Sequence, residues 1–118
     1  MKNADLLARL RQLESDFGDV DVKIEKVSPA DVEGIYGQNY INISSVSTAV
    51  TSVVVTGDST LGTAMKVSAL ITALDALDDT YGVVRLSESG RACVKNANYF
   101  DSTKILNYKD GIIAIILS

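Results

Sequence analysis

Residues 51–77, TSVVVTGDSTLGTAMKVSALITALDAL, decide the fold that the sequence predicts. They read as a β-strand at 52–56, a tight turn at Gly57 and Asp58, and a helix of about five turns over 61–77. Within this helix only Lys66 and Asp75 are charged, so most of its circumference has to be buried. The rest of the chain is therefore expected to pack around this strand and helix.

The N-terminal segment, residues 2–17, predicts an amphipathic helix. Asn3 is the predicted N-cap, and Gly18 stands where a glycine commonly ends a helix. Four large apolar residues recur at spacings of four, three and four, which places them on one helical face: Leu6, Leu10, Leu13 and Phe17. We expect this helix to lie across a β-sheet.

Strands are predicted on both sides of the central segment. Polar and apolar residues alternate over 20–27, which is typical of a half-buried strand, and Pro29 ends it. Residues 40–44 predict a short strand. Residues 44–52 are rich in Ser and Thr, which is compatible with an exposed edge or an arm that needs a neighbour.

The C-terminal third predicts two hairpins. Residues 82–87 and 92–95 flank the first turn, and residues 104–108 and 112–117 flank the pair Asp110-Gly111, which favours a type I′ turn. The last strand, IIAIIL, does not alternate. A strand that is apolar on both faces lies either at the centre of its sheet or against another subunit.

These elements predict a single α+β domain over residues 1–118. It has two layers, in which the N-terminal amphipathic helix and the long buried helix pack on a mostly antiparallel sheet. The composition agrees with one globular domain, with 47% hydrophobic and 22% charged residues and one proline.

Composition also limits the chemistry. The chain has no histidine and a single cysteine, Cys93, so a His-based triad, a His metal site and an internal disulfide are excluded. Cys93 lies in an apolar segment and is expected to be a small buried hydrophobic residue. The net charge of -4 argues against a nucleic-acid partner. The charged N-terminal segment is neither a signal peptide nor a membrane span, so we expect a cytoplasmic protein, with no catalytic residue, metal or cofactor.

The turn from Gly57 to Thr60 is the best candidate for ligand binding. In the predicted fold Gly57, Asp58, Ser59 and Thr60 follow a strand and open a helix, where free backbone amides favour an anion. No lysine follows Gly62, as a phosphate-binding P-loop requires. Asp58 or Ser59 could equally cap the helix, and Asp58 would repel a phosphate.

Three carboxylates crowd the end of the predicted long helix, where the helix dipole disfavours them. They are Asp75, Asp78 and Asp79. Arg85 or Arg91 could offset their charge, as could a cation or a basic patch on a partner. No EF-hand spacing is present, so a solvated or salt-bridged helix end is the leading interpretation.

Five of the seven aromatic residues fall in or beside predicted loops. Each could be a binding anchor or could pack beneath its loop; they are Tyr36, Tyr40, Tyr99, Phe100 and Tyr108.

The order of these elements resembles the small tail-terminator and neck proteins of long-tailed bacteriophages. The features that carry the resemblance are the leucine-rich N-terminal helix, the polar arm at 44–51, the helix opened by Asp58-Ser59-Thr60-Leu61, and the closing hairpin with the apolar strand at 112–117. The resemblance implies a small α/β domain that assembles into a ring and has no catalytic residue. It also implies loops that contact a neighbouring ring or tube.

The leading hypothesis is a non-catalytic homo-oligomeric interaction or structural protein. It would be a component of a bacteriophage virion or an accessory protein of the phage, located in the virion or in the host cytoplasm. Its partners would be further copies of itself and other virion or host proteins, with no nucleic acid and no membrane. The residues predicted to form the assembly interface are Val46, Val50, Ile112, Ile113, Ile115 and Ile116. The alternatives are a module that binds a small ligand or nucleotide through residues 57–60, and an inhibitor that docks on a host protein.

Overall fold

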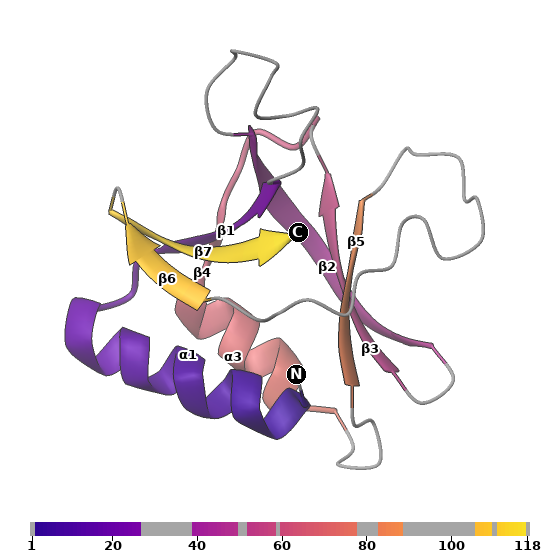
Figure 1. Ribbon diagram of the computed structural model, residues 1–118, viewed down its shortest axis with the longest axis horizontal. Coiled ribbons are helices and arrows are strands. Elements are labelled where there is room, and N and C mark those ends of the chain that lie inside the picture. The colour runs from indigo at the N-terminus through magenta and orange to yellow at the C-terminus, as the bar shows by residue number, and fades with distance from the viewer. Residues whose placement is uncertain are drawn as a thin grey trace.

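The protein is an α+β domain in which two helices pack on a mixed, mostly antiparallel sheet (Figure 1). A computed structural model describes residues 2–26, 39–49, 52–58, 60–77, 83–88, 106–109 and 111–117. The helices and strands in these residues are α1 (Asn3–Phe17), β1 (Asp21–Lys26), β2 (Asn39–Ala49), β3 (Ser52–Asp58), β4 (Met65–Lys66), α3 (Val67–Asp75), β5 (Val83–Glu88), β6 (Leu106–Lys109) and β7 (Ile112–Leu117).

The strands of this sheet follow the order β5-β3-β2-β1-β7-β6, and the short β4 pairs with β1. The pairs β1–β7 and β3–β5 are parallel, and the remaining pairs are antiparallel. Strand β1 is central because it pairs with β2 and β4 on one side and with β7 on the other.

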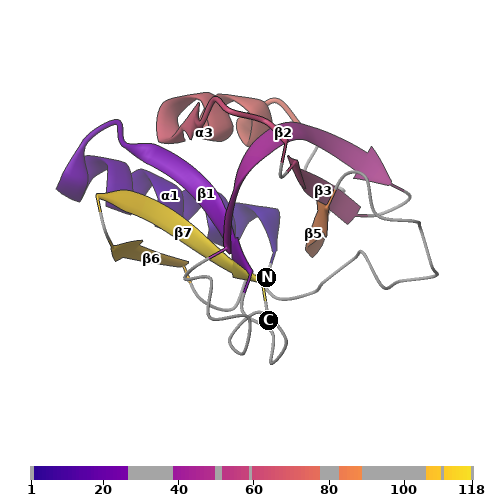
Figure 2. The same ribbon diagram turned by 90° about the horizontal axis from the view of Figure 1, so that it is seen from above.

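The core lies between the sheet and the helices. In Figure 1 both helices lie below the sheet, and Figure 2 shows how strongly the sheet curves. The side chains that fill this space are almost all aliphatic, as the scarcity of aromatic residues predicts. The largest that are fully buried are Leu6, Leu10, Ile24, Ile43, Leu70, Leu74, Ile113, Ile115, Val22, Val53 and Val55.

Helix α1 confirms the predicted N-terminal helix, but its predicted N-cap is wrong. Its leucine stripe is buried, and Gly18 ends the helix with a φ of +87°, a conformation that glycine adopts at low cost. Lys2 holds the N-cap position and its side chain caps no backbone amide. Asn3 lies inside the helix and is buried, because its side chain reaches α3.

The long helix predicted over 61–77 is wrong at its N-terminal end. Helix α3 begins at Val67, because the preceding residues are used for the sheet: Met65 lies opposite Val22, and Lys66 opposite Asp21. The amide of Val67 then donates to the carbonyl of Val20 at 2.9 Å. Pairing with β1 thus outweighs the helix propensity of this short stretch.

Of the two alternatives for residues 44–52, an exposed edge or an arm, the arm is wrong over the residues that are described. Strand β2 continues from Asn39 to Ala49 and pairs along this length with β3. The register shifts between Ile43 and Ser45, and the hydroxyl of Ser44 donates to the carbonyl of Thr56 at 3.1 Å. The Ser and Thr residues therefore belong to a strand with an exposed polar face.

The C-terminal hairpin is confirmed. Lys109 lies opposite Ile112, so the loop has the two residues expected for this turn, and Gly111 has a φ of +78°. Strand β7 lies between β1 and β6. Of the two explanations for its apolar sequence, an inner place in the sheet is the one that the structure shows. Strand β5 confirms the first strand of the other predicted hairpin, and residues 92–95 lie outside the described residues.

Candidate functional site

The turn between α1 and β1 joins the two layers of the domain at one edge. Four successive contacts leave it: the Phe17 ring stacks on β6, the Asp19 side chain bonds to α3, the Val20 carbonyl accepts from α3, and the Asp21 side chain pairs with β4. This junction, residues 17–21, therefore fixes the ends of several elements relative to one another.

Asp19 supplies the N-terminal cap that α3 lacks locally. Lys66, at the N-cap position of α3, makes no capping hydrogen bond with its side chain. Instead Oδ1 of Asp19 accepts from the Ser68 amide at 2.9 Å, and Oδ2 accepts from the Ser68 hydroxyl at 2.9 Å. These two hydrogen bonds, the one from the amide first, lower the pKa of Asp19 below its usual value of 3.8. The cap is thus a charged group from another element.

Beside this cap, Lys66 and Asp21 form an ion pair between directly opposed residues of β4 and β1. The Nζ of Lys66 lies 2.9 Å from Oδ1 of Asp21. The hydrogen bond to Asp21 and the charge of Asp21 raise the pKa of Lys66. Both side chains reach solvent, so the pair contributes little to stability and mainly fixes the position of β4.

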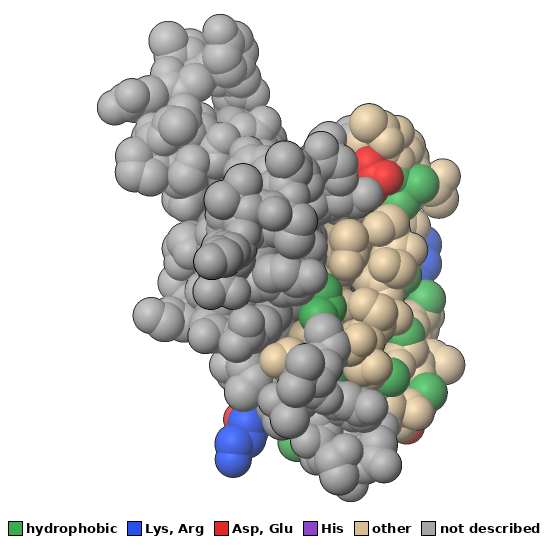
Figure 3. All heavy atoms as spheres, turned by 90° about the vertical axis from the view of Figure 1, so that its right-hand side faces the viewer, with side chains coloured by type: hydrophobic (Ala, Val, Ile, Leu, Met, Phe, Trp, Pro, Cys, Tyr) green, Lys and Arg blue, Asp and Glu red, His purple; other side chains and the backbone are tan. Residues whose placement is uncertain are grey.

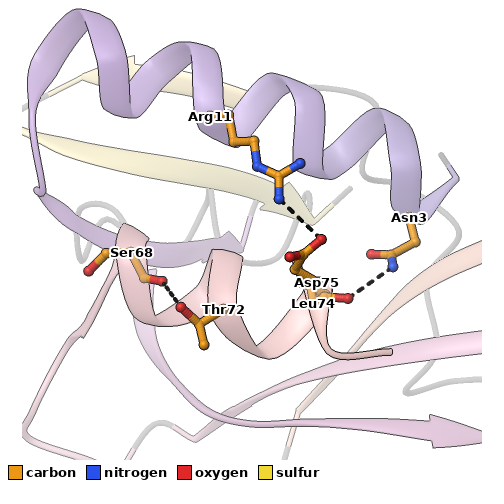
Figure 4. A network of polar contacts seen from close by, with 6 residues as sticks. All are labelled: Asn3, Arg11, Ser68, Thr72, Leu74 and Asp75. Carbon is orange, nitrogen blue, oxygen red and sulfur yellow. Dashed lines mark hydrogen bonds and ion pairs between the residues drawn. The ribbon is translucent and has the colours of Figure 1, made fainter. Parts of the chain in front are cut away.

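The opposite end of α3 is also held by α1 (Figure 4). Nδ2 of Asn3 donates to the carbonyl of Leu74 at 3.3 Å, and Arg11 lies 3.1 Å from Asp75. Arg11 is therefore a cation that offsets the charge of Asp75, and it was not among the predicted candidates. The side chain of Arg85 is not described, and Arg91, Asp78 and Asp79 lie outside the described residues. Since α1 and its flanking turn bond to both ends of α3, the two helices are coupled.

Phe17 and Tyr108 form an exposed aromatic pair at the same edge of the domain. Their ring centroids are 3.8 Å apart and the rings are almost parallel, at 4°. Phe17 is 44% exposed and Tyr108 is 38% exposed. The structure describes only one other large hydrophobic residue as exposed, Leu61. This aromatic pair, Phe17 with Tyr108, is the strongest candidate for an interaction surface among the described residues.

The predicted ligand-binding turn does not have the geometry that an anion site needs. Gly57 and Asp58 end β3, Ser59 lies outside the described residues, and α3 begins only at Val67. Oδ1 of Asp58 accepts from both the amide and the hydroxyl of Thr60, at 2.9 and 2.6 Å, and these bonds lower the pKa of Asp58. A carboxylate thus already occupies the amide that an anion would use, and the predicted helix N-terminus is absent from this turn.

Two of the six predicted assembly residues, Ile113 and Ile115, lie in the core. Ile113 and Ile115 are fully buried within the chain, in its core, so their side chains cannot contact a partner. Ile112 is half-buried, and Val46 is half-buried against the core. Ile116 lies in β7, and Val50 lies outside the described residues. The apolar pattern of the last strand reflects burial within the chain itself.

The side of the domain that carries β2 and β3 offers no comparable aromatic site in its described part. Figure 3 shows in the described part of this side mostly backbone and uncharged polar side chains, with scattered hydrophobic side chains. In β2, Ser44, Ser45, Ser47 and Thr48 are exposed.

Sequence reasoning identified Tyr108 as one of several aromatic candidates but missed its pairing with Phe17. The useful signal was the position of Phe17 as the last member of the helix stripe, directly before Gly18, where a helix leaves its sheet. The cap from Asp19 had no comparable signal, because Ser68 is far from it in sequence.

Comparison with protein-family models, with curated proteins and with solved structures found no match. Within the described residues no group of three or more carboxylate or thiol side chains is placed to hold a metal ion. None of the helices in this part of the chain is long and apolar enough to cross a membrane.

Proposed function

We propose that the chain is a non-catalytic structural protein that assembles with further copies of itself. The observation that supports this most is the exposed aromatic pair of Phe17 and Tyr108. Aromatic side chains are enriched among the residues that dominate binding energy at interfaces. In the described part of the chain, Leu61 is the only other large hydrophobic residue that is exposed.

The rings are also well prepared for binding. Phe17 is held by α1 and by the junction at residues 17–21, and Tyr108 by the pairing of β6 with β7. Each ring already lies against the other, so little side-chain freedom remains to be lost on association. A partner that covers the pair therefore gains apolar burial at a small entropic cost.

In its more specific form, the proposal is a component of a bacteriophage virion, such as a tail or neck protein, or an accessory protein of the host cytoplasm. The layout of a leucine-rich N-terminal helix, a central strand and helix, and an apolar closing hairpin supports this form. The partners would then include other virion or host proteins besides further copies of the chain.

Size-exclusion chromatography with light scattering tests the proposal. The wild type is expected to have a mass above that of one chain, and Phe17→Ser and Tyr108→Ser are expected to lower that mass. Leu61→Ser is the matched control, because Leu61 is exposed to a similar degree, follows β3 in the chain, and is held by the hydrogen bond that Asn42 donates to its carbonyl. A wild type that stays monomeric at all concentrations would contradict self-assembly.

A further inference from the structure

Strand β6 is the last strand of the described sheet, and it carries Tyr108, one member of the aromatic pair. It pairs with β7 on one side, and no described strand pairs with its other side. We propose that two copies of the chain join through β6 around a two-fold axis at Asn107, which continues the sheet from one copy into the other. This inference rests on the proposed function of self-assembly, and it identifies β6 as the contact surface and a second copy of the chain as the partner.

The register follows from the hairpin. Lys109 and Ile112 flank a two-residue loop, and such flanking residues exchange hydrogen bonds with each other. Because hydrogen-bonding direction alternates along a strand, the backbone groups of Leu106 and Tyr108 point away from β7, towards the side of β6 where no described strand pairs. These are the groups that a further strand can pair with.

A second copy of β6 satisfies these groups symmetrically. With the axis at Asn107, Leu106 of each copy lies opposite Tyr108 of the other, and each of these two equivalent pairs exchanges two hydrogen bonds. If the axis lay at Tyr108 instead, Tyr108 of one copy would lie opposite Tyr108 of the other. Leu106 would then have no partner within β6 of the other copy. The antiparallel pairing of identical strands is self-complementary, as a two-fold contact requires.

The aromatic pair then covers the junction. Tyr108 lies opposite Ile113 in the hairpin and Leu106 lies opposite Ile115, so both point to the buried face with the core residues. In the joined sheet the Tyr108 ring of one copy would lie beside Leu106 of the other, on the side where Phe17 also stacks. Exposed rings would thereby become buried at the seam.

The size of this contact predicts how tightly the copies associate. A stable interface buries about 800 Å² on each partner, and an exposed portion of two aromatic rings supplies only roughly a quarter of that area. One short strand and two rings therefore make a small interface. We expect association that depends on protein concentration, with the rings as its anchors.

Disulfide trapping tests the axis. At a non-hydrogen-bonded antiparallel pair the Cα atoms are about 4.5 Å apart, which lies within the range of a disulfide. In a Cys93→Ser background, Asn107→Cys is expected to form a covalent dimer on mild oxidation, at a protein concentration at which the wild type associates. Thr63→Cys, an exposed position between β3 and β4 and outside β6, is the control and is expected to remain largely monomeric under the same oxidation.

The same preparations separate this inference from the proposed function. An even-numbered assembly that is lost in Tyr108→Ser and trapped by Asn107→Cys supports the two-fold contact. An odd-numbered ring, or an assembly that Tyr108→Ser leaves intact and Asn107→Cys does not trap, overturns the contact but leaves self-assembly standing. A wild type that is monomeric at every concentration overturns both.

Discussion

Asp19 and Ser68 lie on different elements, and both carboxylate oxygens of Asp19 accept hydrogen bonds from Ser68, each at 2.9 Å. This contact couples the end of α1 to the start of α3. Together with the bond from Asn3 to the carbonyl of Leu74, it means that α1 and its flanking turn supply polar partners for both ends of α3. Helix α3 therefore depends on α1 for its caps as well as for its packing.

The cap from Asp19 predicts a specific loss of stability in acid. Its pKa is lowered in the folded state, so the stability that it adds is fully present above the unfolded pKa of about 3.8 and is lost as the pH falls through the folded pKa. Asp19→Ala should therefore lower the urea midpoint at pH 7, and the gap from wild type should close below about pH 4. Asp16→Ala is the control. A gap that stays constant down to pH 2.5 would show that the charge of Asp19 does not stabilise the helix.

The bond at the other end of α3 predicts a smaller effect. Asn3→Ala removes the donor to Leu74, which should cost about 0.5–1.5 kcal/mol of unfolding free energy. The value should fall in the lower part of this range, because Oδ1 of Asn3 is buried without a hydrogen-bond partner in the described part of the chain and is removed as well. Chemical denaturation measures the change.

Gln12→Ala is the control for this variant, since Gln12 bonds to the exposed Asp16 on the same helix and should change stability by less than about 0.5 kcal/mol. Hydrogen exchange gives a second readout. Amides in the last turn of α3 should exchange faster in Asn3→Ala, and unchanged protection there would contradict the coupling of the two helices.

Two glycines near the predicted turn make a matched pair. A Cβ at Gly57 would lie 2.5 Å from Cδ1 of Ile41 and 3.1 Å from Cδ1 of Ile24, whereas a Cβ at Gly62 would meet nothing within 4 Å. Gly57→Ala should therefore destabilise the protein by about 1–3 kcal/mol through overpacking, and Gly62→Ala should not. Thermal unfolding distinguishes them.

Replacing Ile41 with Val removes the Cδ1 atom that lies nearest to the added Cβ. Ile41→Val should therefore recover part of the stability lost in Gly57→Ala. Equal stability of the two glycine variants would show that the packing over Gly57 is looser than described.

The Asp58 turn predicts that inorganic phosphate does not bind there. The amide and hydroxyl of Thr60 are already bonded to Asp58, whose lowered pKa keeps it charged at neutral pH. Millimolar phosphate should therefore leave the melting temperature unchanged in wild type. A rise in melting temperature that disappears in Thr60→Ala would instead favour the ligand-binding alternative.

Much of the fold could be predicted from local pattern. The leucine stripe of α1, the alternation in β1, the valine run in β3 and the Asp110-Gly111 turn are each short-range signals, and each predicted element is present at or near its expected place. The predicted α+β class and the mostly antiparallel sheet are confirmed for the same reason.

The errors arose where a distant partner decides local structure. Met65 and Lys66 pair with β1 instead of extending α3, and Asp19 caps α3 from another element. The apolar strand β7 was open to two explanations, because sequence pattern alone cannot say whether a strand is covered by its own chain or by another copy. The aromatic pair was missed because Phe17 and Tyr108 meet only in the folded chain.

Native mass spectrometry of the wild type over a range of concentrations tests self-assembly most directly, because one spectrum gives the number of chains in each species. We expect species of more than one chain, and the fraction of the protein in them should rise with concentration. These species should be lost in Phe17→Ser and Tyr108→Ser but should persist in Leu61→Ser. A single monomeric species at every concentration, in wild type and variants alike, would contradict self-assembly.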